Sequence, residues 1–404
     1  MASYSNLIDG FSRLRTEASM DRLIAATRAR EPKLAQLHRF ADVMAKSGNV
    51  FEWSSDEVTA DLASTGGPTS LSTLLGPLYL RSYGLLIPKL GVPGRPAGGI
   101  DVLAQLPGYR ITFTSREIRD VLTKCGYVHF LADDNFAPLD ALLFRYRQKV
   151  GSQDVPFLAV ASLLAKKIAS GVKIAGLDVR VASHGNFGGT FSQARHFAKM
   201  FCAVARSAGI SAVAVMTDAR TPYQPFVGRG EALLALKTIF DGRAEPWLNE
   251  HNNRCRLMAA HVASLTDRQP TEGESHEIRA RFAQNIEAQG SSMDAFEMKV
   301  DAVVAGHRHK LIATADGFLK IDIGAIRDTF AKVHSRLESA CQFADELGLI
   351  LQVPVGSYVK RGTLLATVRA TGVIWSEFRT KLENAFQAVE LLEYAPGMEE
   401  TIRG

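Results

Sequence analysis

Hydrophobic residues in the first 48 positions recur at helical spacing. They fall three or four residues apart, which places them on one face of a helix. The positions are Leu7, Phe11, Leu14, Leu23, Ile24, Leu34, Leu37, Phe40, Val43 and Met44. A helical pattern returns over residues 139–170. Both stretches are therefore predicted to be helical.

The pattern changes from residue 55 onward, where glycine-punctuated segments with short apolar runs begin. Strands are predicted at 84–88, 127–131, 177–181 and 212–216, and helices at 115–126, 192–209, 230–240 and through much of 241–295. Strands that alternate with helices are typical of a mixed sheet covered by helices. The predicted fold class is therefore α/β.

The C-terminal part carries a hairpin pattern. A strand and a helix are predicted after Gly317, followed by apolar strands over 349–368. The spacing of Gly356, Val359 and Gly362 resembles the half-barrel hairpins of biotinyl and lipoyl domains. The Met-Lys-Met attachment turn of those domains is missing from this hairpin, so a carrier role is not expected.

Composition narrows the class of protein. The 404 residues are 46% hydrophobic and 22% charged, as in an ordinary globular enzyme. No apolar run approaches the roughly 18–20 residues of a membrane span, so no membrane partner is expected. The amino end lacks the continuous apolar core of a secretory signal. Four scattered cysteines without a Cys-x-x-Cys pair indicate reduced thiols in a cytoplasmic protein.

Charge gives little sign of a nucleic-acid partner. The net charge of +5 is mild, and the densest basic runs, 145–149 and 307–310, are short. The second run contains His307 and His309, which resemble a metal pair. Because no carboxylate or cysteine stands at a suitable spacing, neither a metal nor another cofactor is expected.

The most informative motif is the run Asp61-Leu62-Ala63-Ser64-Thr65-Gly66-Gly67. A Ser-Thr-Gly-Gly loop that opens a helix can wrap backbone N–H groups around an anion. The loop is equally compatible with a glycine turn and a helix N-cap. The anion-binding interpretation depends on the blocks that follow at fixed distances.

Three later blocks support that interpretation. They are Phe144-Arg145-Tyr146-Arg147, the helix with Ser162 and Lys166, and the segment 176–181. Ser162 and Lys166 are four residues apart and share a helix face. Arg147 precedes Ser162 by fifteen residues. In order and spacing these blocks resemble the sugar- and base-binding blocks of the thymidine and pyrimidine-nucleoside phosphorylases.

The resemblance implies a domain organisation. A small helical domain, used for dimerisation and base binding, would combine residues 1–50 and 139–170. A larger α/β domain would combine 55–135 and 171–404, with 317–404 as its C-terminal subdomain. The active site of that family lies in the cleft between the two domains. The implied partners are a pyrimidine nucleoside, phosphate as a co-substrate and a second copy of the chain as a homodimer.

The resemblance also assigns roles in the base site. Arg147 offers a planar fork of donors to a pyrimidine carbonyl, Ser162 hydrogen-bonds the ring, and Lys166 faces the negative charge of the departing base. Phe144 and Phe187 are candidate stacking rings. The alternative is that Ser162 and Lys166 belong to an ordinary amphipathic helix and that both rings pack in the core.

The anion side departs from the family pattern. Leu62 and Ala63 stand where the family has Lys and His, and a second glycine loop, 96–100, has lost its hydroxyl groups. Besides the loop Ser64-Thr65-Gly66-Gly67, Ser72 still matches a phosphate-contacting serine. Phosphate binding is expected to be weak. Restoring the two residues by Leu62→Lys with Ala63→His should then raise phosphate-dependent cleavage.

Three other residues are candidates to compensate. Lys89 and Arg95 lie in or near the second glycine loop, in a stretch that also resembles the anthranilate phosphoribosyltransferases. His184 replaces a family glycine, and Arg180 nearby replaces a family lysine. His184 is the candidate acid–base group, because imidazole titrates near neutral pH.

Three functions remain open at this stage. The first is a pentosyltransferase that cleaves a pyrimidine nucleoside with phosphate. The second is an enzyme of the same family that uses water or another nucleophile, or that acts on a nucleotide. The third is a catalytically silent pyrimidine-binding protein. Phosphate dependence of base release separates the first two, and binding without turnover indicates the third.

Overall fold

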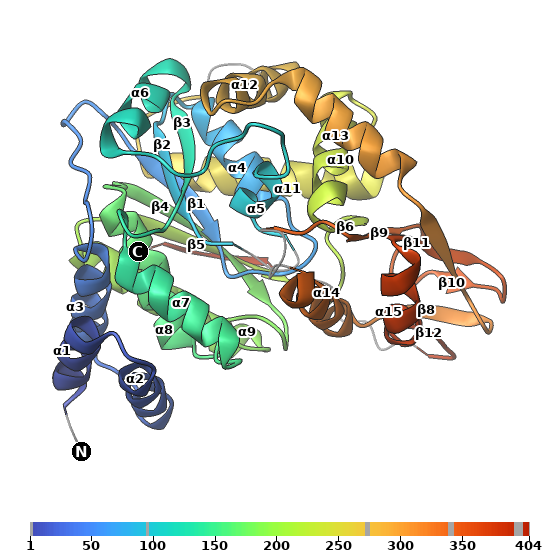
Figure 1. Cartoon of the computed structure of the whole chain (residues 1–404), viewed down its shortest axis with the longest axis horizontal. Helices are drawn as coiled ribbons and strands as arrows, with labels where there is room; N and C mark the ends of the chain where they lie inside the picture. Colours follow the sequence, from blue (N-terminus) through green and yellow to red (C-terminus); the bar gives the residue numbers. More distant parts are fainter. Residues whose placement is uncertain (1–2, 94–96, 271–274, 338–342, 392–398, 404) are drawn as a thin grey trace.

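The computed structural model describes residues 3–93, 97–270, 275–337, 343–391 and 399–403. One end of the molecule consists of helices from two separate stretches of chain (Figure 1). They are α1 (Tyr4–Leu14), α2 (Glu17–Ala29), α3 (Leu34–Ala45), α7 (Pro138–Lys149) and α8 (Pro156–Ala169). Both helical predictions are thus confirmed.

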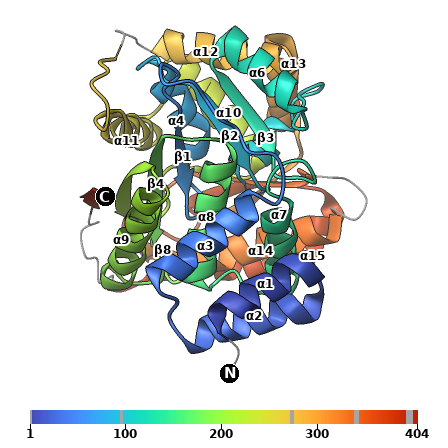
Figure 2. The same cartoon turned by 90° about the vertical axis from the view of Figure 1, so that its left-hand side faces the viewer.

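The apolar stripe of these helices forms their shared core. Phe11, Leu23 and Phe40 are fully buried, and α3 packs against α8 and against α9 (Phe191–Ser207). Figure 2 views the molecule from this end and shows α3 in front of α8. The helical unit therefore closes only when the first 45 residues meet the chain near residue 160.

A four-stranded sheet lies behind the helices, in the order β1-β4-β5-β13. Its strands are β1 (Ala60–Ser64), β4 (Ile174–Val181), β5 (Ser211–Asp218) and β13 (Glu399–Arg403). The first three are parallel and β13 is antiparallel to β5. Helices α4 (Ser72–Arg81), α9 and α11 (Pro246–Ala263) pack on it. The predicted mixed α/β class is confirmed.

A separate parallel pair, β2 (Ile87–Gly91) and β3 (Tyr127–Leu131), stands beside this sheet. The strand predicted at 84–88 begins three residues later, because Gly84 adopts a φ of 67° in a turn. Two helices belong to this part, α5 (Gly99–Leu103) and α6 (Ser115–Cys125). Thr114 caps α6 by accepting a hydrogen bond from the Glu117 N–H.

The remaining strands form two antiparallel sheets at the opposite end of the molecule (Figure 1). One has the order β10-β8-β12 and the other β6-β9-β11-β7. The strands are β6 (Phe226–Val227), β7 (Arg308–Ile312), β8 (Gly317–Ile321), β9 (Leu347–Leu351), β10 (Tyr358–Val359), β11 (Leu364–Ala370) and β12 (Phe386–Val389). Because β6 and β7 come from before residue 317, the C-terminal unit is wider than the segment 317–404.

Four further helices lie between the two ends: α10 (Arg229–Phe240), α12 (Ser275–Ala288), α13 (Met293–Ala305) and α14 (Ile323–Leu337). Helix α15 (Gly372–Asn384) belongs to the C-terminal unit. Helix α14 lies between the C-terminal strands and the helical end in Figure 1. Its apolar residues Ile326, Phe330 and Val333 pack into the C-terminal core. Within the described residues, no helix is both long and apolar enough to cross a membrane.

A fully buried ion pair ties the C-terminal unit to the second glycine loop. Arg229 donates from Nε to Asp101 Oδ2 at 2.8 Å and from Nη1 to the Ala344 carbonyl at 2.7 Å. Asp101 also accepts the Gly98 N–H at 3.0 Å. Neither charged side chain is exposed to solvent. Removal of Arg229 would take this ion pair away from a buried carboxylate.

We predict that Arg229→Met lowers the free energy of unfolding by about 3–5 kcal/mol, because the buried Asp101 would lose its ion pair with Arg229. Urea unfolding followed by circular dichroism measures this loss. Arg28→Met is the control, since its pair with Asp154 is exposed and worth at most about 1 kcal/mol. Equal losses in the two variants would contradict the assigned role of Arg229.

Candidate active site

A cavity of about 590 Å³ opens where β1, β2 and β4 end, between α8 and α14. Volumes of this size are typical of small-molecule sites. Most of the residues singled out in the sequence line it. These are Ser64, Thr65, Gly66, Gly67, Lys89, Phe144, Arg147, Ser162, Lys166, Arg180 and His184. The fold thus brings together residues that are up to 120 positions apart.

Arg147 is buried at the side of the cavity formed by α7 and α8. Its Nε donates to the Ser152 carbonyl at 3.0 Å, and Nη2 donates to the carbonyls of Gln153 and Val155 at 3.0 and 3.4 Å. Burial lowers the pKa of Arg147 to about 10, so the group stays charged at neutral pH. The backbone contacts fix the guanidinium plane and leave Nη1 without a partner among the described residues. Nη1 is therefore the donor available to a ligand.

Lys166 and Ser162 form a hydrogen-bonded unit with a residue that the sequence did not single out, Asp140. The Lys166 Nζ donates to Asp140 Oδ2 at 2.6 Å and to Ser162 Oγ at 2.9 Å. All three side chains are buried. An ammonium has three donors, so one N–H of Lys166 remains for a ligand. Asp140 holds the amine in place and compensates its charge.

The Ser-Thr-Gly-Gly loop follows β1 but does not itself open a helix, because α4 begins only at Ser72. Gly66 and Gly67 adopt φ values of 89° and 144°, which favour glycine. The Gly67 carbonyl accepts a hydrogen bond from Arg180 Nη1 at 3.0 Å. A Cβ on Gly67 would lie 3.1 Å from Arg180 Cδ. The loop is therefore shaped by Arg180 rather than by a helix terminus.

Two sequence predictions are corrected by the structure. Ser72 is fully buried and does not line the cavity; it donates to Asp178 Oδ2 at 2.6 Å and accepts from Arg180. Phe187 is also fully buried, with its ring centroid 5.9 Å from that of Phe197. Both residues support the surrounding structure instead of facing a ligand. Arg95 lies outside the described residues.

Lys89 reaches beneath the loop but is already engaged. Its Nζ donates to Asp61 Oδ1 at 2.7 Å and to the Leu62 carbonyl at 2.6 Å. Lys167 of α8 binds the other oxygen of Asp61. Burial lowers the pKa of Lys89 and of Lys167 to about 7 each, although both contact a carboxylate. One carboxylate cannot compensate two ammonium groups away from water, so one lysine loses its proton readily.

His184 does not meet the expectation of a group that titrates near neutral pH. Burial lowers its pKa to about 4, and nearby Arg327 acts in the same direction. The imidazole is therefore neutral at pH 7 and cannot supply positive charge. Its Nε2 is buried without a hydrogen-bond partner among the described residues. A neutral ring with a free nitrogen can still hydrogen-bond a ligand.

Leu62 and Ala63 face opposite sides of β1, and only Ala63 lines the cavity. Leu62 is 1% exposed and fills the space next to Gly76 and Gly176. A Cβ on Gly76 would lie 2.6 Å from Leu62 Cδ2, and one on Gly176 would lie 2.8 Å from Cδ1. A lysine at position 62 would therefore enter the core. The expectation that Leu62→Lys restores anion binding does not fit this geometry.

Several residues that line the cavity or contact its lining were not found from the sequence. Asp140 could have been found, because it lies seven residues before Arg147 and thus on the same face of α7. Asp61 begins the first motif and Lys167 follows Lys166, but only the fold shows that they meet. Arg327 and Lys332 of α14 also line the cavity. No local signal connects them to motifs more than 140 residues away.

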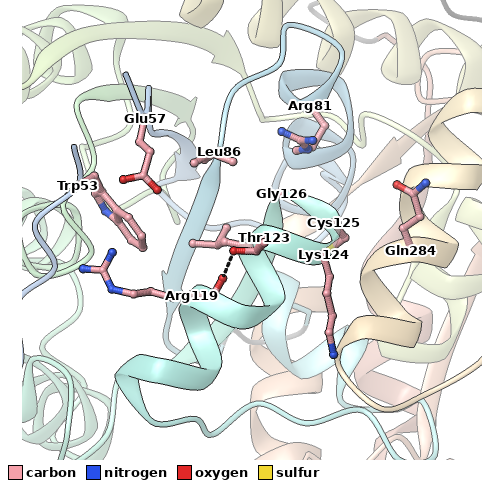
Figure 3. A pocket seen from close by; sticks show the side chains of 11 residues that line it. Trp53, Glu57, Arg81, Leu86, Arg119, Thr123, Lys124, Cys125, Gly126 and Gln284 are labelled. Atoms are coloured by element: carbon pink, nitrogen blue, oxygen red, sulfur yellow. Dashed lines mark hydrogen bonds between the residues drawn. The ribbon is translucent and has the colours of Figure 1, made fainter. Parts of the chain in front are cut away.

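A second cavity, of about 400 Å³, lies between the segment 53–57, α6 and α12 (Figure 3). There the Arg119 guanidinium carbon is 4.5 Å from the centre of the Trp53 ring. None of the candidate site residues that the structure describes lines this cavity. The candidate site residues that line a cavity therefore all line the larger one.

The C-terminal histidines serve packing. The His309 ring stacks on Trp375, with centroids 4.4 Å apart, and His307 contacts His309 edge to face. Within the described part of the chain, no group of three His, Cys, Asp or Glu side chains is arranged to hold a metal.

Comparison with known proteins gives distant relatives, although no family model matches the chain. The pyrimidine-nucleoside phosphorylase of Geobacillus stearothermophilus is 25% identical over 350 residues, covering 80% of this chain and 78% of that protein. The thymidine phosphorylase of Sinorhizobium fredii is 27% identical over 350 residues, covering 81% and 78%. The human thymidine phosphorylase is 25% identical over 390 residues, covering 88% and 78%.

Solved structures agree at the level of the fold. The anthranilate phosphoribosyltransferase of Thermus thermophilus matches with a TM-score of 0.53 and 14% identity, covering 76% of this chain and 97% of that one. The Saccharomyces cerevisiae enzyme, solved in complex with PRPP and Mg, matches with a TM-score of 0.50 and 12% identity, covering 75% and 94%. The chain is thus a distant homologue of the thymidine and pyrimidine-nucleoside phosphorylases, as the sequence motifs predicted.

The two lysines on Asp61 predict a pH-dependent stability. Their pKa values fall from 10.5 when unfolded to about 7 when folded, so the unfolded chain binds more protons between these values. Their contribution to the free energy of unfolding should therefore rise from pH 7 to 10, by up to about 1.4 kcal/mol per pH unit for each lysine. Lys167→Met, which leaves one lysine per carboxylate, should flatten this rise. Urea unfolding at pH 7 and pH 9 measures the slope.

The control for this experiment is Lys310→Met, an exposed lysine outside the cavity. It should keep the wild-type slope. The same slope in wild type and Lys167→Met would contradict the sharing of one carboxylate by two lysines.

Leu62→Lys is predicted to destabilise the protein by on the order of 3 kcal/mol, because an ammonium would enter an apolar core. Thermal unfolding measures the loss. Ala63→Ser is the matched control on the cavity side of the same strand and should cost less than about 1 kcal/mol. A Leu62→Lys variant with wild-type stability and stronger phosphate binding would show that the lysine reaches the cavity after all.

Proposed function

We propose that this distant homologue of the pyrimidine-nucleoside phosphorylases is a pentosyltransferase that cleaves the N-glycosidic bond of a pyrimidine nucleoside and passes the pentose to phosphate. One observation supports this most directly. Arg147, Ser162 and Lys166 line the same cavity as the loop 64–67. A donor set for a pyrimidine and a glycine loop suited to an anion thus face one space.

The base side would stabilise the leaving group. When the C1′–N bond breaks, its electron pair moves to the base, and negative charge spreads to the ring carbonyls. The free N–H of Lys166 and Nη1 of Arg147 are donors with positive charge, while Ser162 Oγ can hydrogen-bond the ring. Donors fixed before the reaction stabilise such charge without reorganising. Asp140 and the carbonyls around Arg147 provide this fixation.

The ring of the base would lie near Phe144, which lines the cavity one helical turn from Arg147. On the other side, the pentose would lie between the base and the loop 64–67. Attack of a phosphate oxygen on C1′ would then form the new C–O bond as the base leaves. In this proposal the neutral imidazole of His184 hydrogen-bonds the substrate rather than transferring a proton.

A second candidate function is favoured by the anion side. Ala63 offers no charge, and Lys89, Lys167 and Arg180 are engaged by carboxylates. A protein with this arrangement would bind a pyrimidine nucleoside but turn it over slowly, with water or another nucleophile, or not at all. The homodimer through the helical domain and the cytoplasmic location stay predictions of the resemblance.

We predict phosphate-dependent release of uracil or thymine from uridine or thymidine, at rates below about 10 per second. Lys166→Gln should lower kcat/KM by at least about 100-fold, since a fixed donor to the leaving group is lost. Chromatography of the released base, with and without phosphate, measures both effects. Lys310→Gln, an exposed lysine away from the cavity, should keep wild-type activity.

The outcomes separate the candidate functions. Base release at the same rate with and without phosphate would indicate hydrolysis. Tight nucleoside binding without release would indicate a binding protein. Absence of both binding and release with pyrimidine nucleosides would contradict the proposed base site.

A further inference from the structure

Apart from Arg147, which donates to backbone carbonyls, the cations that line the cavity divide into two groups. Lys89, Lys166, Lys167 and Arg180 are buried and each contacts a carboxylate. The carboxylates compensate much of the positive charge of these four groups, although Lys166 keeps one N–H for the proposed base. In contrast, Arg327 and Lys332 line the same cavity and have no ion-pair or hydrogen-bond partner among the described residues. Both lie on α14.

Helix α14 turns its polar face toward the cavity. Arg327, Ala331 and Ser335 follow one another at intervals of four residues, and Lys332 lies beside them; all four line the cavity. The opposite face packs into the C-terminal core. Since Ala331 is small, the face offers room between two long cationic side chains. The helix therefore places two cationic side chains along the wall of the cavity, where Arg327 is half-buried and Lys332 is exposed to solvent.

His184 lies close both to α14 and to Arg180, the residue that holds the loop 64–67. The His184 Nδ1 lies 3.8 Å from where a Cβ on Gly324, at the start of α14, would stand. The same imidazole is influenced by the charges of Arg180, which holds the loop, and of Arg327. His184 therefore lies between Arg180, which holds the loop, and the start of α14. Asp328 of the same helix also lines the cavity.

We propose that Arg327 and Lys332 bind a phosphoryl group of the ligand, opposite the loop 64–67. The loop favours this chemistry, because its two positive-φ glycines leave the N–H groups of Gly66 and Gly67 without partners in the described chain. The phosphoryl group would be either free inorganic phosphate or the 5′-phosphate of a pyrimidine nucleotide. The proposal rests on the proposed function. Arg327 and Lys332 would supply the positive charge that the loop 64–67 itself lacks.

The test uses the full-length protein and three probes: uridine, uridine 5′-monophosphate and inorganic phosphate. Titration calorimetry gives their dissociation constants for wild type and for Arg327→Ala/Lys332→Ala. The control is Lys320→Ala, an exposed lysine of β8 outside the cavity. Each lost charge-assisted contact should weaken binding by roughly ten- to a hundredfold. Uridine binding should stay unchanged.

The arms distinguish the source of the phosphoryl group. If it is the 5′-phosphate, wild type should bind uridine 5′-monophosphate at least tenfold more tightly than uridine, and the double variant should lose that preference. If it is free phosphate, the double variant should lose phosphate binding and bind both uridine ligands as wild type does. Either result supports the role of α14.

Two results would overturn the proposal. The first is a double variant that binds phosphate and uridine 5′-monophosphate as tightly as wild type does. The second is a double variant that loses uridine binding to the same extent, which would indicate a general defect in the fold. Failure of wild type to bind uridine would contradict the proposed base site. In that case, loss of phosphate binding in the double variant would still support the role of α14.

Discussion

The contacts of Asp61 hold the two halves of the candidate site together. This carboxylate, on β1, binds Lys89 of β2 with one oxygen and Lys167 of α8 with the other. Strand β1 leads directly into the loop 64–67, and α8 carries Ser162 and Lys166. The buried charges therefore fix the distance between the side that suits an anion and the side that suits a pyrimidine. Because they lie away from water, any change of charge at this point is felt on both sides.

The same ion cluster explains how the site differs from the pattern of its distant relatives. The base side keeps its arginine, serine and lysine in the expected spacing: backbone carbonyls hold Arg147, Asp140 holds Lys166, and Lys166 donates to Ser162. On the anion side the positive groups lie below the loop and are neutralised there. Arg327 and Lys332 of α14, in a different part of the sequence, line the same cavity. In the proposal made above, they supply the positive charge that the loop 64–67 lacks.

The sequence predicted the fold class, most elements and the grouping of Arg147, Ser162 and Lys166, because these depend on local periodicity and short spacings. Ser162 and Lys166 share a helix face by their spacing alone, and the adjacent helix positions Arg147. The errors arose where a side chain's direction depends on packing. Leu62, Ser72 and Phe187 align with positions that the resemblance places in the site, yet their side chains are buried against Gly76, Asp178 and Phe197. Arg327 and Lys332 of α14 reach the cavity only through the tertiary fold, so no local sequence pattern predicts that they line it.

The placement of β13 has a consequence for how the protein is made. Residues 399–403 form the edge strand of the central sheet, paired with β5, and Arg195 of α9 donates to Glu400 of β13 at 2.6 Å. During synthesis, β1, β4 and β5 leave the ribosome long before this strand does. The nascent sheet therefore has an open edge at β5 until translation reaches residue 403. A chaperone that covers an exposed strand would have its longest opportunity there, and a fusion placed after residue 403 would be attached next to this last-formed edge.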